Sequence, residues 1–467
     1  MALNYLLFLI TYFAALLCVG LVFSKKMKGL EDFFLASRDL PSPWIFLSLS
    51  ASWIGATSTL VSVDEAYRGG ISSFWIIGLP AVLTVLMFTF FLARPIRQLP
   101  FLTLPDLVEM RYGRTVRHLA SLLIIWYMAL LAASQMVALG NFLKIFLETS
   151  YLTCLVLGTA VVLIYSVFGG FISVVFTDGL QFFLLVAGIG VLFIFLLQSS
   201  SVQEISQTAT EFGKLDYFNF FYDLKRSFLM ALSFTLAWMI SPIAWQRIQA
   251  ARTVKSAQQG LVAAATALFF FYGMIVGIGL LALPLVLPGD SEGPLLSWLI
   301  STRTGPLLGG FLFVAVLAAV MSTMDTAINT GAFALTHDVY VQILPRHKVK
   351  RVVSASRIST ILVTAMAFLV ATRFQNILQT LGLASEIMAE GLFVPGVAML
   401  FLKKRWPAAG FLSLIAGGGY ALIGFLCQVK LLALNWPAWP FSVPYGLLLS
   451  LAGFLIGLVI DKCNRKF

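Results

Sequence analysis

The stretch ASWIGATSTLVSVDEAYRGG, residues 51–70, decides the fold of this chain. It begins as an apolar helix, runs through small and hydroxyl-bearing residues, and ends with Asp64 beside Glu65. A helix that is interrupted inside a membrane leaves backbone groups unpaired, which is tolerated only where they line a protected site. A carboxylate at the bilayer centre costs about 2.5 kcal/mol or more, so an intramembrane acid indicates function. The depth of these two acids therefore decides whether they belong to the working site.

The composition is that of an integral membrane protein. Of the 467 residues, 60% are hydrophobic and 11% are charged, whereas ordinary soluble domains carry about 25% charged residues. The four cysteines have no metal-type spacing and are predicted to be apolar fillers. The sequence contains no HExxH motif, no GxSxG motif and no cluster of histidines with acids, so it predicts no enzyme.

Apolar segments long enough to cross a membrane recur along the whole chain. A membrane helix needs about 20 mostly apolar residues, and about thirteen segments meet this rule. Their ranges are 4–24, 43–69, 71–94, 117–146, 151–169, 173–198, 224–246, 259–287, 306–339, 354–373, 375–401, 407–427 and 441–461. No connection is long enough to hold a soluble domain, so residues 1–467 are predicted to form a single all-α domain in the lipid bilayer.

Basic residues are concentrated in alternate loops. One set of loops holds most of the 31 Lys and Arg residues, and Arg247, Arg252 and Lys255 are counted in this set. Positive loops stay on the cytoplasmic side. The sequence therefore predicts a multi-pass protein of the cell's inner (plasma) membrane, with the N-terminus outside and the C-terminus in the cytoplasm. The net charge of +11 is explained by this topology, and no nucleic-acid partner is predicted.

Ten segments remain when the first and the last two are set aside. Five is an odd number, so two consecutive five-helix blocks, 43–198 and 224–401, insert with opposite orientation, as in the inverted repeats of many secondary transporters. In that plan the first helix of each block is broken. The candidate breaks are Ser52 to Thr59 and Ser233 to Trp245, where Pro242 removes a backbone donor. Close helix packing is the alternative reason for these small residues. Helix 4–24 and the two helices within 407–461 are additions to the core.

Four stretches resemble the sodium–solute symporter family. They are GLEDFFLASRDLPSPWIFLSLSASWIGATS (29–58), VVFTDGLQ (174–181), SPIAWQRIQAARTVKSAQQG (241–260) and AAVMSTMDTAINTGAFALTHDVY (318–340). The resemblance implies a LeuT-like inverted-repeat fold and secondary active transport. Members of the family couple the influx of sodium to the uptake of sugars, amino acids, vitamins, sialic acids or small organic acids. By this resemblance the chain is expected to be a sodium-coupled symporter that brings a small organic solute into the cell by alternating access.

The resemblance also implies where Na⁺ is held. Its central sodium site maps onto Ala51, Ile54, Ala319, Ser322 and Thr323, and a second sodium site found in some members maps onto Asp178, Ser322, Asp325 and Thr326. The residues themselves agree with this, because a hard cation wants oxygen ligands. Ala319, Ser322, Thr323 and Thr326 share one face of a helix. The alternative is a packed helix whose hydroxyls bond to its own backbone.

The acids of the opening stretch are predicted to lie outside the ion site. Asp64 is roughly 15 Å beyond Ile54 toward the outer side, where Arg68 is close enough to pair with either acid. The acid that reaches the membrane centre is Glu386, roughly 16 Å deep, and Glu390 shares its face. Three interpretations of Glu386 remain open: an acid that holds helices together, a counter-charge for a cationic solute, or a proton site.

The solute is expected to lie just outside the central sodium ion. The family's binding positions map onto Gly55, Ser58, Gln135, Trp238, Ser241, Ser385 and Glu386. Sialic-acid-type members clamp a carboxylate with an arginine on the third core helix, and no Arg or Lys is present within residues 122–142. A small amino-acid-like or amine-bearing solute is therefore favoured. The alternatives to a sodium symporter are a proton-coupled carrier of the same fold that uses Glu386, and a solute-sensing module derived from a symporter. We expect a monomer.

Overall fold

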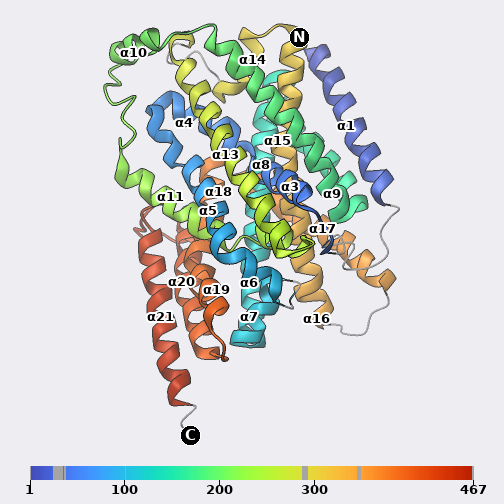
Figure 1. Cartoon of the computed structure of the whole chain (residues 1–467), viewed down its shortest axis with the longest axis vertical. Coiled ribbons are helices and arrows are strands. Elements are labelled where there is room, and N and C mark those ends of the chain that lie inside the picture. Colours follow the sequence, from blue (N-terminus) through green and yellow to red (C-terminus); the bar gives the residue numbers. More distant parts are fainter. Residues whose placement is uncertain are drawn as a thin grey trace.

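The computed structural model describes residues 2–24, 35, 38–99, 101, 103–286, 293–343 and 349–464. In this part of the chain the regular structure is helical, apart from one isolated bridge between Leu40 and Ala251. The helices run mainly along the long axis of the molecule, and the two termini lie at opposite ends (Figure 1). The prediction of an all-α protein is confirmed.

The first half of the chain contains twelve described elements. They are α1 (Ala2–Ser24), α3 (Ser42–Trp53), η2 (Thr57–Val61), α4 (Ser62–Gly69), η3 (Gly70–Trp75), α5 (Gly78–Met87), η4 (Phe88–Leu92), α6 (Ala93–Gln98), α7 (Leu104–Tyr112), α8 (Arg114–Leu147), α9 (Tyr151–Leu197) and α10 (Val202–Glu211). The elements named η are π-helical or 3₁₀ turns that continue or join the α-helices.

The second half begins with a bent helix and ends with two peripheral helices. Its elements are α11 (Leu224–Met239), α12 (Pro242–Ala250), α13 (Val254–Leu281), η5 (Leu283–Leu285), α14 (Leu295–Arg303), α15 (Pro306–Phe333), η6 (Ala334–Tyr340), α16 (Val341–Ile343), α17 (Val349–Arg373), α18 (Ile377–Ile387), η7 (Met388–Leu392), α19 (Phe393–Phe401), α20 (Pro407–Gln428) and α21 (Val443–Cys463).

Nine helices in the described residues are long and apolar enough to cross a membrane, and a tenth results if α11 and α12 form one bent span. Two shorter apolar helices, Asn4–Cys18 and Tyr151–Val167, add to these. The predicted spans 151–169 and 173–198 both fall within the 47-residue element α9, in which Ser173–Leu197 is long and apolar enough to cross a membrane and Tyr151–Val167 is a shorter apolar helix. A straight helix of this length would measure about 70 Å, more than twice the roughly 30 Å of a bilayer core. The count of thirteen spans stays a prediction.

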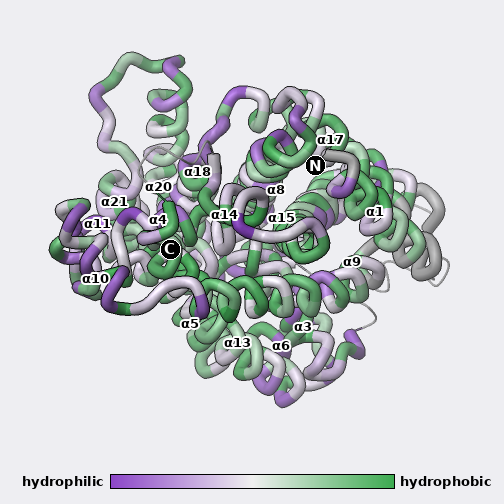
Figure 2. The backbone as a smooth tube through the Cα atoms, turned by 90° about the horizontal axis from the view of Figure 1, so that it is seen from above, coloured by the Kyte–Doolittle hydropathy of each residue, from purple (hydrophilic) through white to green (hydrophobic). Residues whose placement is uncertain are grey.

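The outer surface of the bundle is apolar. Large hydrophobic side chains such as Phe90, Phe270 and Leu455 are more than half exposed, and the hydrophobic colour extends over the outer helices while hydrophilic segments gather at connections (Figure 2). Soluble monomers rarely expose large apolar side chains on so many helices at once. This surface therefore faces lipid, and the polar side chains of the core lie inside.

The centre of the bundle is formed by α8 and α15. In each of these helices 83% of the most apolar segment is buried inside the protein, compared with 33% in α21. Polar side chains are also buried along α15, including Ser322, Asp325 and Asn329. Burial of polar groups costs free energy unless they are paired, so their concentration on the central helix marks the region of the site.

Both predicted helix breaks are present. The first helix of block 43–198 ends at Trp53, and Ile54 is extended with φ −95° and ψ 90° before the chain turns helical again at Ala56. In the second block, α11 and α12 are bent by 42° around Ile240 and Ser241. Pro242 begins α12, where its missing N–H is no loss because the first N–H groups of a helix have no partner within it.

Candidate functional site

At the end of α3, four carbonyl groups accept hydrogen bonds from side chains or from the backbone of the helix break. The last four carbonyls of a helix have no partner within it. Here Ser50 O accepts from the Ile54 N–H at 3.1 Å, Ala51 O from the Ser322 hydroxyl at 3.0 Å, Ser52 O from the Thr323 hydroxyl at 3.3 Å, and Trp53 O from the Ser58 hydroxyl at 3.2 Å. The negative end of the α3 dipole therefore faces α15, and such an end favours a cation.

The structure brings together four of the five residues assigned to the central sodium site. The Ser322 hydroxyl donates to both Ala51 O and Ala319 O at 3.0 Å, and the Thr323 hydroxyl lies 3.4 Å from Ala319 O. Ile54 is the first non-helical residue after α3 and is fully buried. Among the described residues, no hydrogen bond links its carbonyl to the other four.

Two of the residues assigned to the second sodium site, Asp178 and Thr326, contact an arginine that the sequence analysis missed. Arg247 of α12 is 1% exposed. Its Nη2 atom lies 3.2 Å from Asp178 Oδ2, 3.1 Å from Thr326 Oγ1 and 2.5 Å from Ser52 Oγ. The sequence analysis counted Arg247 as a charge of a cytoplasmic loop, which is wrong. Its position next to the proline break, within a helical segment, is the signal that separates it from the loop arginines.

Asp325, the other acid of this group, takes its contact from α9. Its Oδ2 accepts from the Tyr165 hydroxyl at 2.9 Å. The Oδ1 atoms of Asp325 and Asp178 are buried and have no hydrogen-bond partner among the described residues. Asp178 Oδ2 also accepts from the Ser48 hydroxyl at 2.7 Å. Two carboxylates and one guanidinium thus share a region closed to solvent.

A small cavity of about 40 Å³ lies beside the break in the first core helix, which is room for a few water molecules, since one needs about 10–15 Å³. It is lined by Ser52, Trp53, Gly55, Thr57, Ser58, Ile77, Tyr127, Leu131, Gln135, Trp238, Ser241, Ile243, Thr323 and Leu381. Five of the seven predicted solute residues are in this set. No charged side chain is found in the lining that the structure describes. Thr323, which is also assigned to the central sodium site, lines the cavity and donates to Ser52 O, so the cavity adjoins that site.

The polar groups of the cavity are few and well defined. Gln135 Oε1 accepts the free N–H of Ala56 at 2.8 Å, and Ser58 is hydrogen-bonded to Tyr272 at 2.6 Å. Tyr127 and Ser241 add two further hydroxyl-bearing side chains to the lining. Gly55 is required for this close approach, because a Cβ atom there would lie 2.7 Å from Gln135 Oε1 and from Thr323 Oγ1.

Two aromatic rings close the cavity on the side of the second break. Trp53 and Trp238 meet edge to face with their ring centroids 5.8 Å apart. Trp53 and Tyr127 were not among the predicted solute residues. Both are apolar enough to be read as core in a single sequence, and only the fold shows that they face the same space.

Ser385 and Glu386 are not among the residues that line this cavity. Glu386 Oε1 accepts a short hydrogen bond from Ser442, which precedes the peripheral helix α21. Glu390 is fully buried, and neither of its carboxylate oxygens has a hydrogen-bond partner among the described residues. A Cβ atom at Gly446 of α21 would lie 2.2 Å from Glu390 Oε2. These two acids therefore face the peripheral helices α20 and α21 rather than the solute cavity.

Asp64 lies at the opposite end of its helix segment from the break. Its Oδ1 accepts the Leu295 N–H at the start of α14, at 2.7 Å. The predicted pairing with Arg68 is absent: the described residues contain no ion pair between Arg68 and either Asp64 or Glu65. Nearby, Lys214 Nζ donates to Tyr67 O at 2.5 Å. Burial lowers the pKa of Lys214, and the charge of Arg68 lowers it further.

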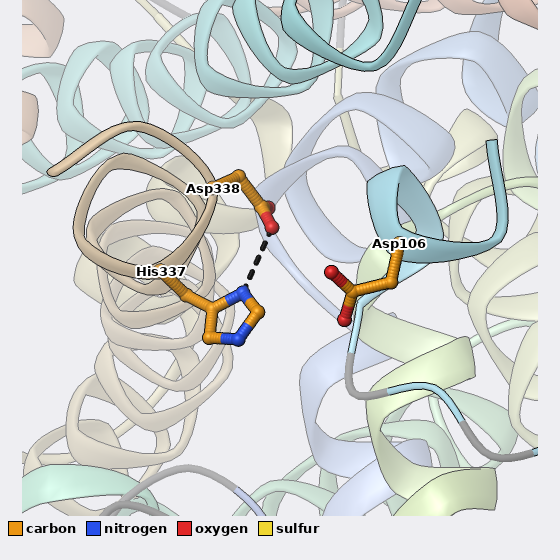
Figure 3. Close-up of side chains that lie close together, drawn as sticks. All are labelled: Asp106, His337 and Asp338. Carbon is orange, nitrogen blue, oxygen red and sulfur yellow. Dashed lines mark hydrogen bonds and ion pairs between the residues drawn. The ribbon is translucent and has the colours of Figure 1, made fainter. Parts of the chain in front are cut away.

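A second cluster of charges lies where α7, α8 and η6 meet. Asp106, His337 and Asp338 each offer an atom within 4.8 Å of the others (Figure 3). Arg117 already supplies the positive charge of this group, because its Nη2 lies 2.8 Å from Asp106 Oδ1 and 3.4 Å from Asp338 Oδ1, and it also pairs with Glu109. The cluster is therefore an ion-pair network that ties three elements together rather than a vacant metal site.

Comparisons with known proteins agree with this geometry. The uncharacterized symporter YwcA of Bacillus subtilis is 27% identical over 457 residues, which is 92% of this chain and 84% of that protein. The high-affinity choline transporter 1 of Drosophila melanogaster is 23% identical over 462 residues, 90% of this chain and 72% of that protein.

Among solved structures, a substrate-bound, outward-open Na⁺-coupled sialic acid symporter has a TM-score of 0.82 at 19% identity, covering 98% of this chain and 97% of that one. This likeness shows the fold. A family model described as the sodium:solute symporter family matches residues 33–417. Since that match spans most of the chain, the protein belongs to the sodium:solute symporter family of multi-pass membrane transporters.

Proposed function

We propose that this protein carries a small organic solute into the cell together with sodium, by alternating access. The observation that carries the proposal is the juxtaposition of a capped helix end, two hydroxyls of α15 and an uncharged cavity. A site of carbonyl and hydroxyl oxygens without a carboxylate suits a monovalent cation, because divalent cations in proteins usually have carboxylate ligands. Each sodium ion that moves down 100 mV supplies about 2.3 kcal/mol.

The architecture proposed for this function is a 5+5 inverted repeat of residues 43–198 and 224–401, within a single domain. Its support is that each block begins with a broken helix, at Ile54 and at Ile240–Ser241. The protein is proposed to lie in the bacterial plasma membrane, with its N-terminus outside the cell and its C-terminus in the cytoplasm. In support, the termini lie at opposite ends, and α6, α7 and α16, which carry or adjoin basic segments, lie toward the C-terminal end (Figure 1).

The proposed sodium ligands are the carbonyls of Ala51, Ile54 and Ala319 with the hydroxyls of Ser322 and Thr323. In the structure the Ser322 hydroxyl donates to Ala51 O and Ala319 O, and the Thr323 hydroxyl donates to Ala319 O and also to Ser52 O, which is outside this group. Each hydroxyl oxygen keeps lone pairs that an ion can use when the proton turns elsewhere. The ion would thus replace hydroxyl protons as the partner of the α3 carbonyls.

The proposed solute residues are Gly55, Ser58, Gln135, Trp238 and Ser241, joined by Trp53 and Tyr127. This set offers hydroxyl, amide and aromatic groups but no fixed charge. Aromatic faces attract ammonium groups, whereas a carboxylate inside a nonpolar cavity needs a cationic partner. We infer that the solute is small, partly apolar and amine-bearing, a class that agrees with the choline named for one relative.

Uptake into proteoliposomes and thermal unfolding of the purified protein test this function. Sodium, compared with potassium at equal ionic strength, is expected to raise the melting temperature, and the Ser322→Ala variant is expected to lose most of this rise. A library of amines and amino acids is then tested in sodium for a further rise and for sodium-driven uptake. An equal melting temperature in sodium and potassium, with uptake that ignores the sodium gradient, contradicts the proposal.

A proton-coupled carrier is the second candidate, and one observation favours it. Glu386 and Glu390 are buried one turn apart, and no basic side chain in the described ranges forms an ion pair with either. Intramembrane acids of this kind are common in proton relays. Uptake driven by an inward proton gradient without sodium, and lost in Glu386→Gln, is the result that this mechanism requires.

A further inference from the structure

The side chain of Arg247 is the most extensively bonded cation in the core. Besides its contacts with Asp178, Thr326 and Ser52, its Nε atom donates to Ser48 Oγ at 3.0 Å and its Nη1 atom donates to Ile243 O at 3.3 Å. The guanidinium therefore reaches from α12 to α3, α9 and α15. All of these partners are oxygen atoms, which are also the ligands that a sodium ion requires.

Arg247 already contacts two of the four residues assigned to the second sodium site, Asp178 and Thr326. Asp178 Oδ2 accepts from Ser48, Ser52 and Arg247, and Thr326 Oγ1 is shared between Arg247 and Ser52. The region is closed to water, because Asp178 is fully buried and Thr326 and Arg247 are each 1% exposed. Two cations cannot share one carboxylate oxygen in such a region without strong mutual repulsion.

We propose that Arg247 is a tethered cation that takes the place of the second sodium ion, so that one sodium ion rather than two is coupled to each solute. This inference rests on the proposed sodium coupling at the central site. A sodium ion enters from solution and leaves again, whereas a guanidinium stays attached to α12 throughout the cycle. Its charge therefore stabilises Asp178 without drawing on the sodium gradient.

The consequence for transport is a change in driving force. With one coupled ion, the greatest accumulation of a neutral solute scales with the first power of the sodium electrochemical gradient, whereas with two ions it scales with the square. Arg247 therefore determines stoichiometry without belonging to the central ion site or lining the solute cavity.

The first test counts sodium ions on the purified full-length protein with ²²Na⁺ at equilibrium. The wild type is expected to bind one ion per chain, and Asp178→Asn is expected to bind one as well. A wild type that binds two ions, with one of them lost in Asp178→Asn, overturns the inference. A wild type that binds none contradicts the proposed sodium coupling itself, so the two failures are distinguishable.

The second test removes the tethered charge. Arg247→Met removes the guanidinium from Asp178 Oδ2 and Thr326 Oγ1, which become available to an ion beside the unpartnered Oδ1 atoms of Asp178 and Asp325. This variant is expected to bind a second ²²Na⁺ and to show a sodium dependence of its melting temperature with a Hill coefficient above one. Arg247→Lys keeps the charge and is expected to bind one ion. The double variant Arg247→Met/Asp178→Asn removes one positive and one negative charge, so the net charge is unchanged, and it is also expected to bind one ion.

If Arg247→Met fails to fold, the wild-type count and the Hill coefficient of wild-type sodium stabilisation decide the question. A Hill coefficient of one supports the inference, and a coefficient clearly above one contradicts it. A folded Arg247→Met protein that still binds a single ion contradicts it too, because the vacated oxygens then have no affinity for sodium.

Discussion

The Nη2 atom of Arg247 lies 3.2 Å from Oδ2 of Asp178, and both side chains are buried in the core. Breaking a buried ion pair by removing one partner typically costs about 3–5 kcal/mol. Because Arg247 belongs to α12 and Asp178 to α9, this pair fixes the second half of the bent helix against the bundle.

Ser322→Ala is expected to weaken sodium binding about tenfold. The substitution removes one of the proposed oxygen ligands of the ion, a hydroxyl that lies 3.0 Å from Ala51 O and Ala319 O, and a polar contact with a charged group is worth about 1.5 kcal/mol or more. The measurement is the sodium concentration that gives half of the thermal stabilisation. Ser121→Ala is the matched control, because Ser121 is equally buried and its hydroxyl donates only to Arg117 O. Equal sodium dependence in the two variants would remove Ser322 from the site.

Gly55→Ala is expected to abolish uptake. The added methyl group would lie 2.7 Å from Gln135 Oε1 and from Thr323 Oγ1, which pushes apart the two groups that frame the cavity. Gly190→Ala is the control, because a Cβ atom there meets nothing within 4 Å and alanine favours the helix by about 0.5–1 kcal/mol. Uptake by Gly55→Ala at the level of Gly190→Ala would show that the cavity tolerates the methyl group.

Gly446→Ala is expected to destabilise the protein by about 1–3 kcal/mol, as overpacking of a core does. The new Cβ atom would lie 2.2 Å from Glu390 Oε2. In a Glu390→Ala background most of this cost should disappear, which a double-mutant cycle of unfolding free energies measures. Gly419→Ala, which meets no atom within 4 Å, controls for the helix preference of alanine. A coupling energy near zero would show that the contact does not limit packing.

Arg117→Met is expected to cost more stability than Asp338→Asn. Removing the guanidinium leaves Asp106, Glu109 and Asp338 facing each other, at about 3–5 kcal/mol, whereas Asp338→Asn leaves Arg117 two carboxylates and costs about 1–3 kcal/mol. Thermal unfolding in the same detergent measures both. The reverse order would mean that the network does not need its cation.

The stability of the protein is expected to rise with pH in the alkaline range through Lys214. The pKa of Lys214 is lowered in the folded state, so below the usual lysine value of about 10.4 the unfolded chain binds more protons than the folded one, and stability increases with pH there. Lys214→Met should show a smaller rise in melting temperature than the wild type. Lys225→Met, at an exposed position, should keep the wild-type slope.

The helix breaks could be predicted from sequence because they depend on local chemistry, whereas the proposed sodium and solute residues were assigned by the resemblance to the family. A run of Ser, Thr and Gly beside an apolar segment, or a proline within one, determines where backbone groups become free, and the helical repeat places Ala319, Ser322 and Thr323 on one face. The structure adds that this face meets the end of α3.

Other features depend on which helices pack against each other, which a single sequence does not contain. Glu386 was assigned to the solute by the resemblance to the family and by its depth in the membrane, but its side chain contacts Ser442, which precedes α21. Arg247 was read as a loop charge because basic residues cluster near helix ends. Its burial follows from the bend at Ser241, whose direction no local pattern gives.

The hydroxyl caps on α3 affect the return of the empty carrier. When an ion leaves, the carbonyls of Ala51 and Ser52 still accept hydrogen bonds from Ser322 and Thr323, so no backbone group is left stranded in a nonpolar interior. An unloaded site that satisfies its own polar groups can reorient without cargo, which net accumulation requires. A site left unsatisfied would restrict the protein to exchanging one solute molecule for another. In the proposed transport cycle, the capped break is therefore expected to favour net uptake over exchange.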